Sequence, residues 1–73
     1  GNMELIKLQD QNGLNVWLDK SKITSIRTQP VPFQDNSGIT FNWVIALGSD
    51  TIKVFTNLDY TEAELGTALG ITL

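Results

Sequence analysis

Two apolar runs meet at Gly48 and Ser49 within residues 42–56, NWVIALGSDTIKVFT, and no other stretch limits the possible folds as strongly. Glycine at the first central position of a two-residue turn takes the positive φ of a type II′ turn at little cost. The stretch therefore predicts a β-hairpin, and the rest of the chain must fit around an antiparallel strand pair.

The register of this hairpin decides which side chains can anchor a core. A two-residue turn puts Trp43, Ile45, Ile52 and Val54 on one face and Val44, Ala46, Thr51 and Lys53 on the other. A three-residue loop would instead pair Trp43 with Phe55 and Ile45 with Lys53. We favour the two-residue turn because it makes one face wholly apolar.

A second hairpin is predicted nearer the start of the chain, with strands at residues 3–9 and 14–19. The Asn-Gly pair between them suggests a two-residue type I′ turn, but that register mixes polar and apolar side chains on both faces. A three-residue loop that ends at Gly13 makes one face wholly apolar, and we choose it on that ground. It pairs Leu8 with Val16 and Ile6 with Leu18, and the opposite face carries Lys7, Gln9, Asn15 and Trp17.

The segment between the two hairpins holds one more predicted strand. Ile23 and Ile26 are three positions apart, which does not suit one strand face. We therefore expect Ile23 to close a polar corner and residues 25–29 to form the third strand, with Ile26 inward. Pro30 cannot donate a ladder hydrogen bond and should end this strand. Residues 30–38, PVPFQDNSG, have the composition of an irregular loop, and residues 39–47 and 50–56 supply the last two strands.

A short helix over Glu62–Leu69 is the last predicted element. Thr61 and Glu64 have the spacing of a capping box, in which each side chain accepts a hydrogen bond from the other residue's amide. Gly70 suits the left-handed position that ends a helix. A helix of two turns is too short to persist alone, so we expect Leu65 and its apolar neighbours to dock on the sheet.

These elements predict one mainly β domain over residues 1–73. Its five antiparallel strands would form a meander that curls into a small open barrel or roll, with the C-terminal helix over one opening. A domain of this size buries only about 60% of its unfolded surface, so its core is thin. The chain has no Cys to form disulfides, which leaves a partner subunit as the remaining support.

The residue types that carry common chemistry are missing. Cys and His are absent, which removes thiolate metal sites, the usual zinc ligand and the usual general base. Ser21 lies between two lysines, but neighbours in an extended chain point to opposite sides. Glu62 and Glu64 would lie on different faces of the helix, and there is no glycine-rich phosphate loop. We expect no catalytic residue, no metal site, no cofactor and no enzymatic activity.

Sequence features also bear on where the protein acts. No apolar run approaches the roughly 20 residues of a membrane-spanning helix, and no signal peptide is present. Gly1 and Asn2 read as the remnant of an expression tag before Met3, so a leader could have been removed with the tag. On this basis we expect a cytoplasmic protein without a membrane span.

Aromatic side chains suggest how the protein works. Trp17, Phe33 and Phe55 could form an exposed apolar patch. Either the curled sheet or the docked helix covers them, or they form a subunit interface, in which aromatic residues are enriched. We expect an interaction module that associates with itself, as a dimer or a higher oligomer, and with an unidentified protein partner.

The alternative function is that of a small barrel that binds oligonucleotides. Lys7, Trp17 and Lys53 would share an outer face, and basic and aromatic side chains together bind single strands. The net charge of −3 opposes a nucleic-acid surface, so we do not expect nucleic acid as a partner.

The order of the elements resembles the very small bacterial β-rich proteins of the flagellar FlbD (SwrD-like) family. The similarity runs over most of the chain and rests on the hydrophobic pattern of five segments: Ile6-Lys7-Leu8, Val16-Trp17-Leu18-Asp19, Ile23-Thr24-Ser25-Ile26, Thr51-Ile52-Lys53-Val54 and Glu62-Ala63-Glu64-Leu65. The resemblance implies a β-meander closed by a short helix. It also implies a non-enzymatic accessory protein that acts through contacts, with no catalytic residues.

Overall fold

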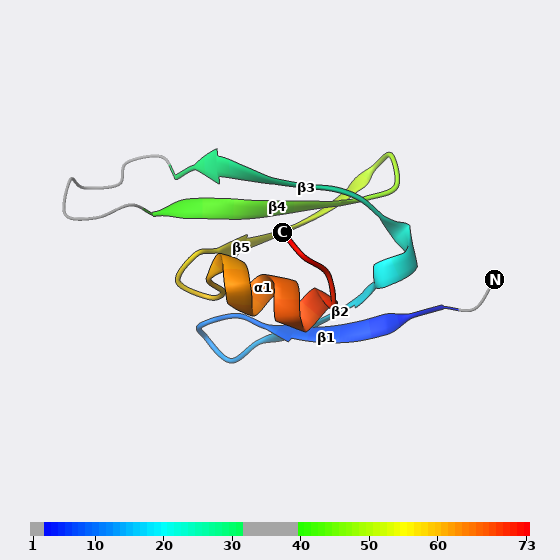
Figure 1. Cartoon of the computed structure of the whole chain (residues 1–73), viewed down its shortest axis with the longest axis horizontal. Coiled ribbons are helices and arrows are strands. Elements are labelled where there is room, and N and C mark those ends of the chain that lie inside the picture. The colour runs from blue at the N-terminus through cyan, green and yellow to red at the C-terminus, as the bar shows by residue number, and fades with distance from the viewer. Residues whose placement is uncertain (1–2, 32–39) are drawn as a thin grey trace.

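The computed structural model describes residues 3–31 and 40–73 of the chain. These residues form five strands, a 3₁₀ turn and one α-helix (Figure 1). In chain order they are β1 (Leu5–Gln9), β2 (Asn15–Asp19), η1 (Lys20–Lys22), β3 (Ile23–Pro30), β4 (Phe41–Leu47), β5 (Thr51–Thr56) and α1 (Glu62–Leu69). The predictions of a mainly β chain and of a C-terminal helix over Glu62–Leu69 are confirmed.

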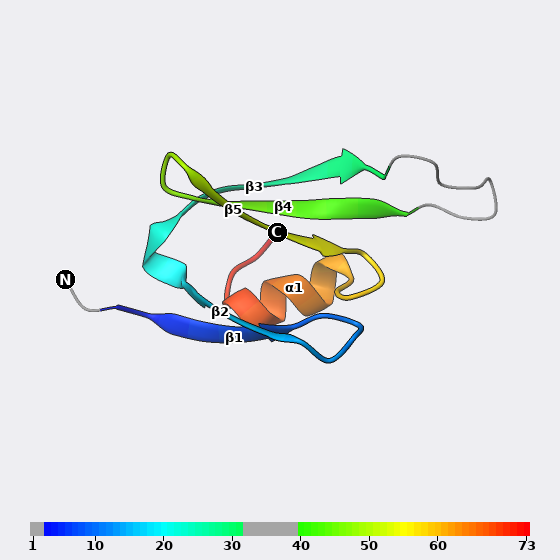
Figure 2. The same cartoon turned by 180° about the vertical axis from the view of Figure 1, so that it is seen from behind.

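The strands form two open antiparallel sheets, so the prediction of one five-stranded meander is wrong. β1 pairs with β2, and the second sheet has the order β3-β4-β5. The pairing stops between β2 and β3 because η1 turns the chain there, where the Asp19 carboxylate accepts hydrogen bonds from the Ser21 amide and hydroxyl. No closed barrel forms within the described residues. Figures 1 and 2 show α1 between the β1–β2 hairpin and the three-stranded sheet.

The first hairpin has the predicted three-residue loop. Leu8 pairs with Val16 and Ile6 with Leu18, and Gly13 has a φ of +82°. The Asp10 amide donates to the Leu14 carbonyl at 3.0 Å, which adds one more ladder hydrogen bond at the turn. The rule that one face must be wholly apolar therefore selected the right register.

The second hairpin does not have the predicted two-residue turn. β4 and β5 pair in the three-residue register, with Trp43 opposite Phe55 and Ile45 opposite Lys53. This register buries Phe55 in place of the smaller Ile52 and Val54. The Phe55 ring then packs edge-on against Tyr60, with 5.7 Å between the ring centroids. Lys53 shares the core-facing side of β5, where it is half-buried on the edge strand and its long stem can lead the ammonium group to water.

The third strand is longer than predicted at both ends. The register shifts between Ile23 and Ser25, which makes a bulge at Thr24. The extra residue lets Ile23 and Ile26 pack against the same core although they are three positions apart. Pro30 is the last residue of β3 instead of the first of the loop, because its position on an edge strand needs no amide hydrogen bond to β4. The rest of the predicted loop, residues 32–38, lies outside the described residues.

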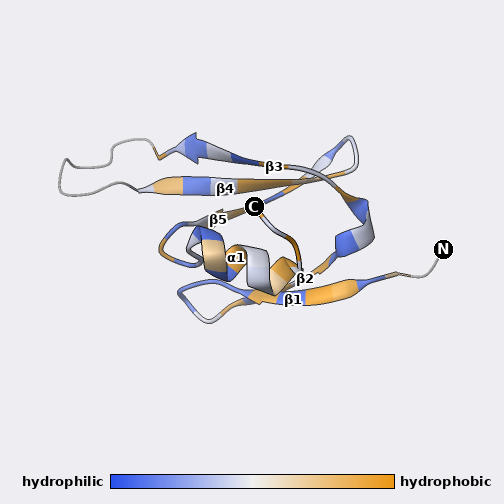
Figure 3. Ribbon diagram, viewed as in Figure 1, coloured by the Kyte–Doolittle hydropathy of each residue, from blue (hydrophilic) through white to orange (hydrophobic). Residues whose placement is uncertain are grey.

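The core lies between the two sheets and the helix. Its buried side chains come from both sheets and from α1: Leu8, Leu18, Trp43, Ile45, Phe55, Leu65 and Leu69. Figure 3 shows hydrophobic residues in β1, β4 and α1, three of the elements that surround this core. The predicted docking of the helix through Leu65 is confirmed, since that side chain is 0% exposed.

Both ends of the helix are formed as predicted. The Thr61 hydroxyl accepts from the Glu64 amide, and the Glu64 carboxylate accepts from the Thr61 amide. Gly70 ends the helix with a φ of +71°. The chain then folds back over Gly66, where a Cβ atom would lie 2.8 Å from the Ile71 carbonyl oxygen, so only glycine fits that position without a shift.

Candidate interaction surfaces

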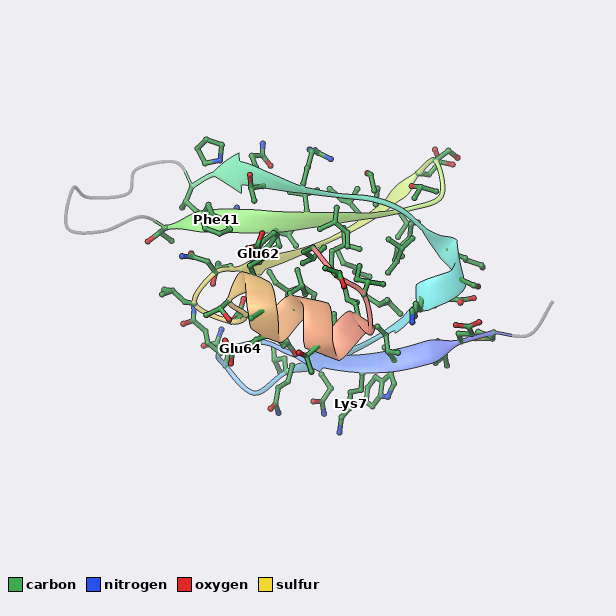
Figure 4. The ribbon with its side chains drawn as sticks, in the orientation of Figure 1. Lys7, Phe41, Glu62 and Glu64 are labelled. Carbon is green, nitrogen blue, oxygen red and sulfur yellow. The ribbon has the colours of Figure 1, made fainter. Side chains whose placement is uncertain are left out.

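Lys7 and Trp17 form the centre of the outer face of the β1–β2 hairpin. The two residues are paired across the strands, and Trp17 is 59% exposed. Figure 4 shows the Lys7 side chain pointing away from α1. This face is therefore open to solvent, as the sequence predicted for Trp17.

Phe55 is not part of any exposed patch, and the expectation that it could be is wrong. It is 3% exposed because the three-residue register turns it toward Trp43 and the core. This outcome matches the alternative in which the fold covers the aromatic side chains. Phe33, the third member of the predicted patch, lies outside the described residues.

The predicted nucleic-acid face does not assemble as one surface. Lys7 and Trp17 lie on the outer face of the hairpin, whereas Lys53 lies on the other sheet, on the side of β5 that faces the core. The sequence missed this separation because it assigned Lys53 with the two-residue register, which inverts the faces of β5.

Large apolar side chains lie on the outer faces of both sheets. On the hairpin, Leu5 and Trp17 are 55% and 59% exposed. On the three-stranded sheet, Ile52 and Val54 are 55% and 50% exposed, and they flank Val44, which is 1% exposed. Ile52 and Val54 face outward for the same reason that Phe55 faces inward, since side chains alternate along a strand.

The outer edge of β1 is partly closed by the loop that follows β5. The Gln9 amide donates to the Tyr60 hydroxyl at 2.8 Å, and the Gln11 amide donates to the Asp59 carboxylate at 2.6 Å. The other oxygen of Asp59 accepts from the Thr56 amide at 2.7 Å. One loop thus satisfies backbone donors of the hairpin and of the three-stranded sheet.

The outer edge of β5 is open over most of its length. The Asn57 amide donates to the Phe41 carbonyl, and hydrogen-bonded pairs alternate along an antiparallel ladder. The amides of Ile52, Val54 and Thr56 must therefore point away from β4. Thr56 is closed by Asp59, but within the described residues Ile52 and Val54 make no backbone hydrogen bond outside the sheet.

The outer edge of β3 carries three features that discourage pairing with another strand. Thr24 forms the bulge, the Arg27 side chain is exposed, and Pro30 has no amide hydrogen. Bulges, charges and prolines are the common means by which natural proteins protect sheet edges. The outward amides left on this strand are those of Ile26 and Thr28, because alternate residues bond to β4.

Two carboxylates have pKa values below their ordinary range. The Ser21 hydroxyl and the backbone amides of Glu4 and Ser21 donate to Asp19 and hold its pKa low. The amide and hydroxyl of Thr61 likewise lower the pKa of Glu64, at the start of α1 (Figure 4). Both shifts come from hydrogen bonds that hold turns and caps together, which explains them without any reactive role.

The described residues were compared with the patterns of two common kinds of site, a metal-ion cluster and a membrane-spanning helix. Across residues 3–31 and 40–73, His, Cys, Asp and Glu side chains gather in no group of three or more that could hold a metal ion. Within the same residues, no helix is long and apolar enough to cross a bilayer.

Comparison with known proteins gives no relative, since no protein-family model, curated protein or solved structure matches this chain. The resemblance to the flagellar FlbD (SwrD-like) family stays a prediction from the hydrophobic pattern.

Proposed function

We propose that this chain is a non-enzymatic interaction module that acts through protein contacts, as a homo-oligomer. The observation that carries the proposal is the pair of outward apolar side chains on β5, Ile52 and Val54, each at least half exposed beside the buried Val44. Singly scattered exposed apolar residues are ordinary on monomers, and contiguous exposed apolar patches mark contact surfaces, to which we assign these two neighbouring side chains. The two sheets would act as an open roll around α1, with strand edges available to a partner.

The outer face of the hairpin supports the same proposal. Leu5 and Trp17 lie on that face and are each more than half exposed, at 55% and 59%. Tryptophan is among the residues enriched at the centres of interfaces. This second surface is where we propose that an unidentified protein partner binds, as the resemblance to an accessory family also suggests.

A function without catalysis fits the residue types of the chain. The sequence has no Cys and no His, so a nucleophile or general base would have to come from residues that seldom serve without one of them. The Asp and Glu side chains with lowered pKa are held by turn and cap hydrogen bonds. We therefore propose contacts, and no chemical step, as the activity.

The alternative of oligonucleotide binding finds no support in the arrangement of Lys7, Trp17 and Lys53. We expect no tight binding of single-stranded DNA or RNA, because Lys53 lies on a different sheet from Lys7 and Trp17 and the net charge is −3. A titration at low salt that quenches tryptophan fluorescence, and that weakens steeply as salt is added, would revive the alternative.

The oligomeric state tests the proposal directly. We expect light scattering to give at least twice the 8.1 kDa mass of the chain at micromolar concentration. A mass that stays at 8.1 kDa up to millimolar concentration would contradict self-association.

A further inference from the structure

We propose that β5 is the strand through which two copies of this chain pair, edge to edge and antiparallel. The inference rests on the homo-oligomer proposed above and names the surface that forms it. The paired β5 strands would join two three-stranded sheets into one continuous sheet across a two-fold axis.

The backbone of β5 has what such pairing needs. The outward amides and carbonyls of Ile52 and Val54 have no protein partner within the described residues, so they can exchange hydrogen bonds with an identical strand. The other edge of this sheet is protected by a bulge, by Arg27 and by Pro30. On the β1 edge, Tyr60 bonds the Gln9 amide, and the charged side chain of Lys7 at the centre of the strand interrupts the apolar outer face, where β5 has the β-branched Ile52 and Val54.

The remaining edge, that of β2, fits a second strand less well. The amides of β2 that point away from β1 are those of Asn15, Trp17 and Asp19. Asp19 at its end uses its carboxylate to close η1, and η1 turns the chain away from the plane of the strand. β5 is longer, with 6 residues against 5, and its outer side chains are β-branched, which suits pairing.

The side chains of β5 select among the possible registers. A two-fold axis at Lys53 would put this residue opposite its own copy, and like charges directly opposite each other destabilise a strand pair. Axes at Ile52 or at Val54 place Lys53 opposite an uncharged residue of the other copy, Thr51 or Phe55. The axis at Val54 pairs Ile52 with Thr56, so Asp59 would have to release the Thr56 amide in that register. Both registers bring Ile52 and Val54 of the two copies together on the outer face.

Self-pairing also explains why the outer face of β5 is apolar. In one copy, Ile52 and Val54 have neighbours on the β4 side only, which leaves them 55% and 50% exposed. A second β5 supplies cross-strand neighbours on the other side. Closed two-fold dimers are the commonest assemblies of identical chains, and an isologous contact needs only this one strand from each copy.

The proposal can be tested by removing one outward amide hydrogen of β5. Val54→Pro removes an amide hydrogen that β4 does not use, so the sheet can keep its own ladder while the edge loses two intermolecular hydrogen bonds. We expect the dissociation constant of the dimer to rise by about tenfold or more. The matched control is Thr28→Pro, the same change at an outward amide of β3, and this variant should dimerise as the parent chain does.

A second variant guards against loss of the fold. Ile52→Lys keeps every amide and adds a charge to the exposed side of β5, where it should weaken the dimer without unfolding the domain. Circular dichroism checks each variant, and light scattering measures its mass. A dimeric parent chain whose folded Val54→Pro or Ile52→Lys variant associates as strongly as the parent overturns the assignment to β5 and leaves the homo-oligomer standing. A parent chain that is monomeric overturns both proposals.

Discussion

The edge of β1 and the edge of β5 lie on different sheets, and the loop after β5 bonds one outward amide of each. On β1, the Gln9 amide is bonded by the Tyr60 hydroxyl at 2.8 Å. On β5, the Thr56 amide is bonded by Asp59, and the amides of Ile52 and Val54 have no partner among the described residues. The two edges differ in their outward side chains: Lys7 places a charge at the centre of β1, whereas Ile52 and Val54 make the outer face of β5 apolar. The apolar edge is the one that we propose serves a partner.

The comparison also shows where the molecule is held together. A two-stranded hairpin is marginally stable alone, so β1 and β2 depend on their contacts with the rest of the chain. Those contacts are the shared core, to which α1 contributes Leu65 and Leu69, and the hydrogen bonds that hairpin amides donate to Asp59 and Tyr60. Damage to either should release the hairpin before it affects the three-stranded sheet.

The largest expected effect comes from the helix that joins the two sheets. Leu65→Ala should lower the free energy of unfolding by roughly 2–5 kcal/mol, since it leaves a cavity at a fully buried position. Urea melts measure the loss. Glu62→Ala is the control on the same helix and should be mild, because Glu62 is exposed and offers only a screened interaction with the helix dipole. Equal losses for the two variants would mean that the helix is not docked.

The next effect concerns the loop that closes the β1 edge. Asp59→Ala removes the acceptor for the amides of Gln11 and Thr56, and we expect a loss of about 1–3 kcal/mol. Amide exchange at these two residues should accelerate, while exchange at Ile45 in the core strand should change least. Unchanged exchange at Gln11 would show that the loop does not hold the hairpin.

A smaller effect is expected at the helix cap. Thr61→Ala should lower the free energy of unfolding by about 1 kcal/mol, the usual result of losing an N-cap hydroxyl. Thr61→Ser keeps the acceptor and serves as the control, with most of the stability retained. If Thr61→Ala lowers the free energy of unfolding as much as Leu65→Ala does, the cap contributes far more than its one hydrogen bond.

The smallest expected effect is a dependence on pH. Glu64 and Asp19 have lowered pKa values in the folded chain, so each stabilises the fold above its unfolded pKa and loses that contribution as pH falls through its folded pKa. Urea melts should therefore show falling stability on acidification below about pH 4. Glu64→Gln should make this slope shallower. An unchanged slope would mean that the Glu64 carboxylate does not contribute to the pH dependence of stability.

Local chemistry predicted the elements of this fold well. The capping box, the positive φ of Gly13 and Gly70 and the strands around them follow from a few neighbouring residues. The register of the first hairpin also followed, because only one choice made a wholly apolar face. In each case the deciding information lay within a few residues along the chain.

The register of the second hairpin and the sheet topology could not be predicted from neighbouring residues alone. Both registers of β4 and β5 offer apolar faces, and the choice depends on Tyr60 and the helix, which pack on Phe55 from later in the chain. Because that register was wrong, Ile52 and Val54 were assigned to the core and Phe55 to the surface patch. The open edge of β5 was therefore hidden from the sequence, although the three-residue alternative would have shown it.

Amide hydrogen exchange at the two edges of the three-stranded sheet is the most direct test of the claim that β5 pairs with a second copy. Ile52 and Val54 on β5 and Ile26 and Thr28 on β3 all have outward amides in a single chain. The account predicts that exchange at Ile52 and Val54 slows as protein concentration rises through the dimer transition, while exchange at Ile26 and Thr28 stays fast. Fast exchange at all four residues in a chain that is dimeric by mass would contradict it.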